Sequence, residues 1–323
     1  MSRAPRRMLR SCSAALVALS AVAVTIGVGS TAVSASTDAS HTVSAATTTY
    51  PVTIKAANGN ITIPARPTAI VSLSPTATEM LYAIGAGSQV KAVDSYSDYP
   101  KNAPITKLNA YQPNVEAIIA YKPDLVIVSG DTTGLTAQLA KLGVPVLSDP
   151  AAVNLAQEYA QFNELGVATD HVAQASTEVA KIKKQVARIV KATPKTGTQT
   201  YYWELEQDYY SVTSATFIGQ LLGLLHLHSI ADAAKGAAAS GGYPQLSAEF
   251  IIKANPNFIF LADTLCCGQT AKKVEKRPGW GIITAVKHGN IVPLNDDIAS
   301  RWGPRVVDLL QSVANAVTKA DNH

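Results

Sequence analysis

The sequence lacks the short motifs that mark most enzyme active sites. Its 323 residues contain no G-x-S-x-G nucleophile elbow and no G-K-[ST] phosphate loop. The stretch Gly85-Ala86-Gly87 imitates part of a dinucleotide fingerprint, but it follows a predicted helix and lacks the third Gly, so it predicts a helix end. A hydrolytic α/β enzyme would need a nucleophile–base pair, and none is evident.

Cysteine and histidine are scarce, with 3 Cys and 6 His. Adjacent Cys266 and Cys267 lack C-x-x-C spacing, so they form no redox or zinc motif. They join in a strained disulfide between neighbours, remain free thiols or pair between chains. His226 and His228 would share one face of a strand, but no third ligand lies at a useful spacing, which argues against a zinc or manganese binder.

Net charge is also lacking once the N-terminus is set aside. Residues 1–35 have a positive start, an apolar run from Ala14 to Val28 and a small-residue cleavage pattern, which together predict a secretory signal peptide. Arg6-Arg7 weakly resembles a twin-arginine signal, and ordinary secretory export is favoured. The four Arg of this segment account for the whole formal charge of +4, so the remaining chain is neutral. A neutral chain offers no basic surface for nucleic acid.

The signal peptide carries no lipoprotein cysteine at its cleavage site. Cys12 precedes the apolar run, and Arg10-Ser11 stand where a lipoprotein signal needs an aliphatic-to-small pattern. We therefore expect an exported protein of the periplasm, cell envelope or extracellular space. Residues 36–49 are rich in Ser, Thr and Ala and have almost no large apolar side chain, which predicts a disordered leader.

From Tyr50 onward, short strand-like apolar segments alternate with helical ones. This order predicts α/β lobes whose parallel sheets are covered by helices on both faces. The longest predicted helix runs from Asp170 to Ala192, because its apolar residues recur at alternating spacings of three and four. We expect an N-terminal lobe at 50–169, a bridging helix at 170–193 and a C-terminal lobe at 194–323. Strands are predicted at 52–54, 60–63, 69–73, 90–93, 125–128, 145–147, 200–203, 209–212, 258–261 and 291–293, and further helices at 77–84, 115–120, 135–142, 217–225, 250–254 and 306–319.

One stretch of the chain occurs twice. Residues 115–129 read V-E-A-I-I-A-Y-K-P-D-L-V-I-V-S, and residues 248–262 read A-E-F-I-I-K-A-N-P-N-F-I-F-L-A, without a gap between the copies. Both predict a short helix, a turn with Pro and a buried strand. Glu116 and Glu249 begin the two helices, where an acid complements the helix dipole. An acid at the same place in two related lobes also suggests a functional pair.

Aromatic residues gather in loops that follow predicted strands. In open α/β sheets these loops form ligand sites, so a cluster of aromatic side chains there favours a binding pocket. Asp297 and Arg301 lie four residues apart beside one of them. The aromatic residues concerned are Tyr96, Tyr99, Tyr111, Tyr209, Tyr210, Tyr243 and Trp302.

Three segments resemble a known family. They read R-P-T-A-I-V-S-L-S-P-T-A-T-E from Arg66, S-Y-S-D-Y-P from Ser95, and V-E-A-I-I-A-Y-K-P-D-L-V-I from Val115. They are similar to the substrate-binding proteins of ABC transporters that bind iron-siderophores, haem or vitamin B12. The resemblance implies two Rossmann-like lobes joined by one long rigid helix, a ligand in the cleft between them, and no enzymatic activity. It also implies a monomer that docks on a permease dimer through Glu116 and Glu249. Without a lipoprotein cysteine, three alternatives stay open for the mature protein: it is free, held by its transporter or tethered by an uncleaved signal.

The vitamin B12-binding members give the nearest local matches. Tyr96 matches an aromatic ligand contact, and Asp297 and Arg301 match a contacting acid and base, whereas Tyr111 and Tyr243 replace Trp. The resemblance thus implies a ferric siderophore or a cobalamin-type ligand. Haem is the alternative, because Tyr can ligate haem iron and Arg301 and Arg305 could meet its carboxylates. The expected ligand-binding residues are Tyr96, Tyr111, Tyr210, Tyr243, Asp297, Arg301 and Trp302, with no metal and no resident cofactor; an exported hydrolytic α/β enzyme is the alternative of another class.

Overall fold

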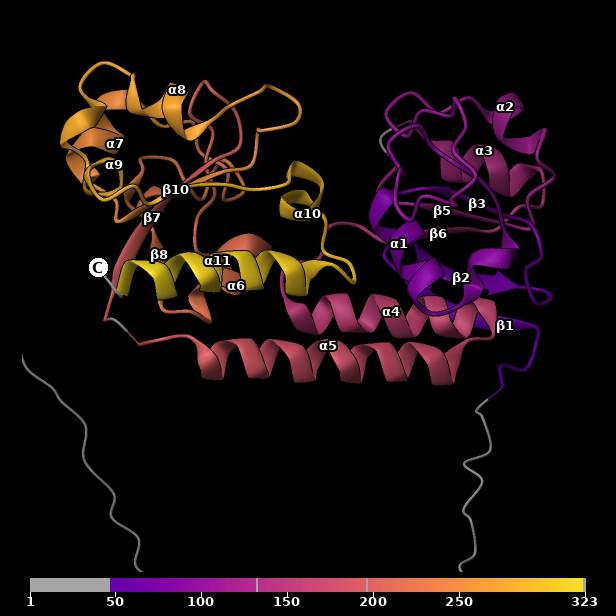
Figure 1. Ribbon diagram of the computed structural model, residues 1–323. Helices are drawn as coiled ribbons and strands as arrows, with labels where there is room; N and C mark the ends of the chain where they lie inside the picture. Colours follow the sequence, from indigo (N-terminus) through magenta and orange to yellow (C-terminus); the bar gives the residue numbers. More distant parts are fainter. Residues whose placement is uncertain (1–46, 132, 196, 322–323) are drawn as a thin grey trace, which may run out of the picture. The chain divides into compact units, whose positions relative to one another are not determined.

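Two four-stranded parallel sheets form the framework of the protein (Figure 1). The computed structural model describes residues 47–131, 133–195 and 197–321, which belong to one compact unit. The predicted signal peptide and most of the predicted leader lie outside these residues. The two sheets confirm the predicted α/β class with two parallel-sheet lobes. No helix within the described residues is long and apolar enough to span a membrane.

The first lobe is built on a sheet with the strand order β4-β3-β5-β6. All residues of its strands are buried except Lys91, and all the buried ones are apolar except Ser72 and Ser148. Such strands are expected in a parallel sheet that is covered on both faces. A hairpin of two antiparallel strands precedes this sheet. The elements of the lobe are β1 (Val52–Ala56), β2 (Gly59–Ile63), β3 (Ile70–Leu73), α1 (Pro75–Ala83), η1 (Ala86–Gln89), β4 (Val90–Val93), α2 (Val115–Ile119), β5 (Leu125–Val128), α3 (Leu135–Lys141) and β6 (Val146–Ser148).

The second lobe repeats this topology, because its sheet has the order β8-β7-β9-β10. Its core contains the largest fully buried side chains, including Trp203 and Trp280. Its elements are β7 (Gln199–Glu204), α6 (Phe217–Gly223), β8 (Leu227–Ser229), η2 (Ile230–Ala233), α7 (Ala248–Ala254), β9 (Phe258–Leu261), α8 (Ala271–Glu275), η3 (Trp280–Ile282), α9 (Thr284–Lys287), β10 (Ile291–Pro293) and α10 (Asp296–Ser300).

The sequence repeat is also a structural repeat. Helices α2 and α7 begin with equivalent side-chain caps, since Asn114 Oδ1 accepts from Ala117 N and Ser247 Oγ accepts from Phe250 N. After each helix, the residue that follows the Pro contributes a side-chain oxygen that holds the start of the neighbouring central strand. Asp124 accepts hydrogen bonds from Thr68 and Ala69, and Asn257 accepts from Thr200. The repeat is therefore specified by polar anchors as well as by its apolar residues.

Three long helices join the lobes. Helix α5 (Val172–Ala192) packs along α4 (Leu155–Thr169) and α11 (Val306–Asp321), as Figure 1 shows. One stripe of α5, including Val179, Ile182 and Ile189, is buried, as its spacing predicted. Helix α5 begins at Val172 rather than Asp170, because Asp170 adopts a left-handed φ of 62° that ends α4.

The structure contains elements that the sequence did not predict, namely α4, β8, α8, α9 and α10, and it lacks one strand that was predicted. Helix α4 was not predicted, because its buried face includes the polar residues Glu158 and Gln161 and so interrupts the apolar stripe. The predicted strand at 209–212 was wrong: Tyr209 has φ 75°, and only Tyr210 pairs, in an isolated bridge with Gln245. A residue with positive φ does not fit a strand, so this segment is part of the loop that follows β7.

Candidate ligand-binding site

A hollow of about 220 Å³ lies at the carboxyl ends of the first-lobe strands β3, β4 and β5. This edge of a parallel sheet is where ligands bind in open α/β folds, because the loops there diverge. The hollow is lined by Leu73, Pro75, Asp94, Tyr96, Ala110, Tyr111, Ser129 and Gly130. The structure therefore brings together Tyr96 and Tyr111, two of the residues selected from the sequence.

The rings of Tyr96 and Tyr111 form an edge-to-face pair with centroids 5.5 Å apart and an interplanar angle of 83°. Both side chains are exposed, Tyr96 by 51% and Tyr111 by 76%. The loop of Tyr111 is fixed by Asn109, whose Oδ1 accepts hydrogen bonds from the backbone of Tyr111 and Gln112. Two exposed aromatic faces at right angles offer a flat ligand one ring to stack on and one edge to meet.

Asp94 lies beneath this pair and is buried. Burial raises the pKa of Asp94, although the hydroxyl of Ser97 donates to its Oδ1 and opposes the shift. The backbone N–H of Asp94 donates to Ser72 O at the end of β3. Asp94 thus fixes the turn that carries Tyr96 rather than presenting a charge to the hollow.

In the second lobe, Tyr210 and Tyr243 lie on neighbouring loops beyond the sheet. Both are partly exposed, and the bridge between Tyr210 and Gln245 joins the two loops. Partial burial raises the pKa of the Tyr243 phenol. The adjacent Tyr209 turns inward instead and stacks on Trp280, with centroids 6.0 Å apart. Tyr209 is therefore a packing residue, while Tyr210 and Tyr243 keep exposed faces.

A buried ion pair that the sequence did not reveal supports these loops. Glu204 ends β7 and forms a bidentate pair with Arg277, whose guanidinium also lies 4.6 Å from the Trp280 ring centroid. Asp263 follows β9 and is buried beside them. Burial raises the pKa of Asp263 to about 7, and the charge of Glu204 adds to this effect, while Arg277 opposes it. One feature of the sequence indicated this pair: Glu204 is an acid at the end of a buried strand, where a charge needs a partner.

Arg301 reaches across to the first lobe. Its Nη1 donates to Glu79 Oε1 and Asp98 Oδ1, each at 3.0 Å, and its Nη2 donates to Tyr96 O at 3.0 Å. Nη2 also donates to Asp297 Oδ1 at 2.7 Å. Each Nη atom thus has two acceptors for its two hydrogens. Arg301 and Asp297 were expected to face a ligand, and in the structure they face each other and the first lobe.

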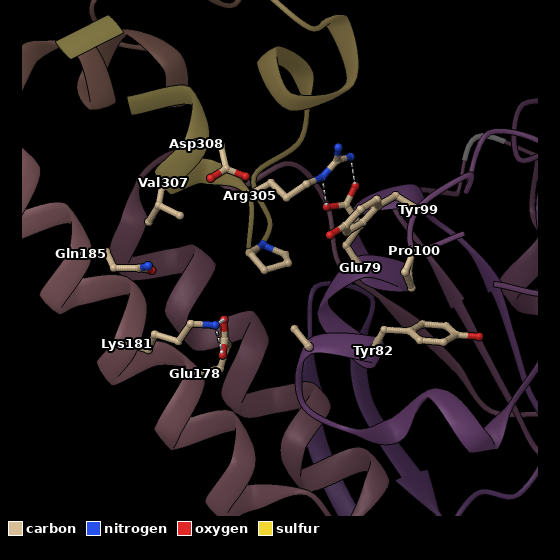
Figure 2. A pocket seen from close by; sticks show the side chains of 12 residues that line it. Glu79, Tyr82, Tyr99, Pro100, Glu178, Lys181, Gln185, Arg305, Val307 and Asp308 are labelled. Atoms are coloured by element: carbon tan, nitrogen blue, oxygen red, sulfur yellow. Dashed lines mark hydrogen bonds and ion pairs between the residues drawn. The ribbon is translucent and has the colours of Figure 1, made fainter. Parts of the chain in front are cut away.

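Arg305 completes the same network (Figure 2). Its Nε and Nη2 donate to the two oxygens of Glu79, and its guanidinium lies 4.2 Å from the Tyr99 ring centroid. Beneath this pair is a pocket of about 460 Å³ between α1, α5 and α11. On its α5 side, Glu178 pairs with Lys181 within one helix. The pocket therefore borders the network and not the aromatic hollow.

Trp302 is also engaged between the lobes. Its indole Nε1 donates to Gln161 Oε1 at 2.9 Å, and Gln161 Nε2 donates to Pro150 O at 2.7 Å. Gln161 lies on the buried face of α4, the helix that the sequence did not reveal. Trp302 is thus held by the first half of the chain, whereas it was expected to face a ligand.

Glu116 and Glu249 are both exposed in the first turns of α2 and α7. In Figure 1 these two helices lie far from α5. Hydrogen bonds from its own backbone N–H and from Ser247 lower the pKa of Glu249. Both residues therefore present carboxylates to solvent at equivalent places in the two lobes.

Cys266 and Cys267 form a disulfide between adjacent residues in an exposed loop after β9. The carboxylate of Asp296 fixes this loop by accepting hydrogen bonds from the backbone of Thr264, Leu265 and Cys266. His228 lies exposed on β8, and His226 precedes that strand with φ 60°. In the described part of the chain, no group of three or more His, Cys, Asp and Glu residues is placed to hold a metal ion.

Comparison with known proteins identifies the family of the chain. Residues 70–298 match the family model described as periplasmic binding protein. An uncharacterized ABC transporter substrate-binding lipoprotein of Bacillus subtilis (strain 168), YvrC, is 33% identical, covering 84% of this chain and 87% of the relative. A cobalamin-binding protein of Halobacterium salinarum is 27% identical over 94% of this chain and 84% of its own.

Solved structures share the fold. A possible iron-binding, periplasmic solute-binding protein from Staphylococcus epidermidis superposes with a TM-score of 0.67. It is 28% identical in sequence, and the match covers 78% of this chain and 99% of that one. The family match spans most of both sheets, from β3 to α10. The chain therefore belongs to the periplasmic binding protein family, and it is the substrate-binding component of an ABC transporter.

Proposed function

We propose that the protein captures a large, flat ligand of the cobalamin type and delivers it to an ABC importer, with a ferric siderophore as the second candidate. Proteins of this family bind and deliver solutes and are not enzymes. They work outside the cytoplasm, where this chain meets its ligand. The ligand contacts proposed here are Tyr96 and Tyr111 from the first lobe and Tyr210 and Tyr243 from the second.

The state of Arg301 carries the choice of ligand. Its side chain is 9% exposed, and both Nη atoms are fully engaged with acceptors of the protein. A ligand carboxylate would have to displace Glu79 or Asp297 to reach it. Arg301 and Arg305 face three acids, Glu79, Asp98 and Asp297, so this group carries one more acid than base. The site thus offers little attraction to the propionates of haem or to an acidic siderophore.

Aromatic faces suit a corrin ring with neutral amide edges. Each buried aromatic contact adds about 0.5–1.5 kcal/mol beyond its apolar area, and phenol hydroxyls exchange hydrogen bonds with amides. The cobalamin-binding protein of Halobacterium salinarum supports this candidate. The possible iron-binding protein of Staphylococcus epidermidis supports the second candidate, and a neutral ferric hydroxamate would meet the same uncharged site.

The ligand class is tested by titration of the mature chain with cyanocobalamin, ferrichrome and haemin, followed by isothermal calorimetry. We expect saturable binding of cyanocobalamin with one site per chain. Tight binding of ferrichrome alone would select the second candidate. Binding of haemin in preference to both would show that Arg301 leaves its acids for a ligand carboxylate, and absence of binding by all three would overturn the proposal.

Delivery is proposed to use one acid on each lobe. Glu116 and Glu249 are exposed at equivalent positions, so a monomer with two similar lobes can meet two similar permease subunits with one carboxylate each. Such rim charges act mainly on encounter rate and register rather than on affinity. Docking through these residues leaves the aromatic site untouched.

A further inference from the structure

We propose that Glu79 anchors a lock between the lobes, and that Arg301 acts through this lock as the positioning residue of Tyr96, so that the lobes are held at binding distance before the ligand arrives. This inference deepens the proposed function and rests on it for its affinity measurements. It assigns Arg301 to the protein's own first lobe rather than to the ligand.

Glu79 is the centre of the lock. Its side chain is completely buried on α1, yet its two oxygens accept from Arg301 Nη1, Arg305 Nε and Arg305 Nη2. Figure 2 shows Arg305 and Glu79 facing each other above the 460 Å³ pocket. A buried carboxylate needs such partners, because an unpaired buried charge is strongly unfavourable. The segment that carries both arginines is therefore bound to the first lobe by contacts of the protein alone.

Arg301 transmits this attachment to the ligand site. Its Nη2 donates to Tyr96 O, and its Nη1 donates to the Asp98 carboxylate two residues further on. The backbone position of Tyr96 decides where its exposed ring lies against Tyr111. A residue of the second lobe thus sets the aromatic wall of the first.

Two further contacts hold the same segment. Arg305 stacks on Tyr99, which extends the held loop beyond Asp98. Trp302 donates to Gln161 on α4, a contact that does not involve the ion pairs. Residues 301–305 therefore bind the first half of the chain through three side chains, of which Arg301 and Arg305 share Glu79 and Trp302 contacts Gln161.

The lock and the alternative, direct contact of Arg301 with a ligand, predict opposite effects of one substitution. Replacement of Glu79 by Gln keeps the shape of the side chain but removes the charge that holds both arginines. If Arg301 binds the ligand, this change frees it and affinity stays equal or rises. If Arg301 positions Tyr96, the affinity for the ligand falls. Glu79 is buried beneath the network and has no exposed surface with which to contact a ligand, so this fall would act through Arg301.

The test compares Glu79→Gln, Arg301→Lys and the double variant with the wild-type chain. We expect each single variant to bind cyanocobalamin, or ferrichrome if that is the ligand, roughly tenfold to hundredfold more weakly, the loss of one or two charge-assisted hydrogen bonds. The affinity of the double variant should be no lower than that of the single variant that binds more weakly, because both changes open the same lock. Glu178→Gln is the matched control, since Glu178 lines the same pocket but pairs only within α5.

A second readout does not need a ligand. The chain has three tryptophans, of which Trp203 and Trp280 are completely buried in the second lobe. A change in tryptophan emission when the lock opens therefore reports on the third, Trp302. We expect red-shifted emission and a larger radius of gyration in solution scattering for Glu79→Gln, and neither change for Glu178→Gln.

Unchanged emission, radius and affinity in both Glu79→Gln and Arg301→Lys would overturn the lock. If the wild-type chain binds none of the ligands, the proposed function fails, while emission and scattering still decide on the lock. If Glu79→Gln does not fold, the emission and the radius of gyration of Arg301→Lys, which keeps the charge at this position, decide on the lock.

Discussion

Lys122 and Asn255 occupy equivalent positions in the two lobes and share a left-handed backbone, with φ of 50° and 48°. Each precedes a Pro, and each turns the chain from a short helix into a buried strand. Neither residue is Gly, so both copies of the turn keep a conformation that L-residues seldom adopt. The two copies of the turn thus share this backbone angle, and Glu116 and Glu249 lie in the first turns of the helices that precede them.

This equivalence predicts a transport defect without a binding defect. In Glu116→Ala/Glu249→Ala, uptake of the ligand by cells should fall by up to roughly tenfold at low salt, because the two proposed ion pairs with the permease would be lost. Affinity for the ligand in solution should be unchanged. Asp321→Asn, which also removes an exposed acid, is the control for charge alone. Normal uptake by the double variant would remove these residues from the docking surface.

Tyr111 gives the simplest test of the aromatic site. It is 76% exposed, so Tyr111→Ala removes a ligand surface without opening a core cavity. We expect affinity to fall roughly threefold to tenfold, in proportion to the loss of one aromatic contact, with no change in melting temperature. Tyr111→Trp should keep or improve affinity because the ring is larger. Tyr121→Ala is the matched control, since Tyr121 is exposed after α2 and outside the hollow. Equal affinity of all three variants would mean that the ligand binds elsewhere.

The sequence was sufficient for the features that depend on local pattern. The apolar runs of β3 and β5 and the stripe of α5 predict buried elements directly, because each apolar side chain faces the core at its own spacing. Helix α4 was missed because Glu158 and Gln161 occupy its buried face. No local rule reveals a polar residue that is buried in order to bind Trp302 from far along the chain.

The arrangement of the site could be predicted only in part. Tyr96 and Tyr111 both lie in the loop between β4 and α2, so their position at the carboxyl edge of the sheet could be predicted. The pairing of Glu79 with Arg301 joins residues 222 positions apart, and neither spacing nor composition indicates it. Arg301 was therefore expected to contact a ligand, because Asp297 and Arg301 match a contacting acid and base of the vitamin B12-binding members.

Asp263 predicts a pH dependence of stability. Its pKa is raised from 3.8 to about 7, mainly by burial and then by the charge of Glu204. The folded chain thus holds this proton more tightly than the unfolded chain, and the wild-type protein loses stability as pH rises from about 4 to about 7. Asp263→Asn imitates the protonated acid, so its melting temperature should exceed that of the wild type at pH 8 and match it near pH 4.

The control for this prediction has the opposite sign. Burial raises the pKa of Asp131, but hydrogen bonds from Thr136 and Leu135 outweigh it and lower the pKa overall. Asp131→Asn should therefore lose stability at neutral pH, and the loss should shrink as pH falls below 4. Melting curves of both variants from pH 8 down to values well below pH 4 decide the matter. A lower melting temperature for Asp263→Asn at pH 8 would contradict the role given to its buried charge.

Two glycines of one helix predict opposite effects of the same substitution. A Cβ on Gly219 of α6 would overlap Thr213 O and lie 2.5 Å from Ser214 Cα, both backbone atoms that cannot yield by rotation of a side chain. Gly219→Ala must therefore displace the loop that leads into the helix, at a cost of about 1–3 kcal/mol or more. A Cβ on Gly223 would meet nothing within 4 Å, so Gly223→Ala should be neutral or stabilise by up to about 1 kcal/mol through reduced backbone freedom. Chemical denaturation of the two variants measures the difference, and equal stabilities would show that the 213–214 segment moves freely and that α6 is not held against it.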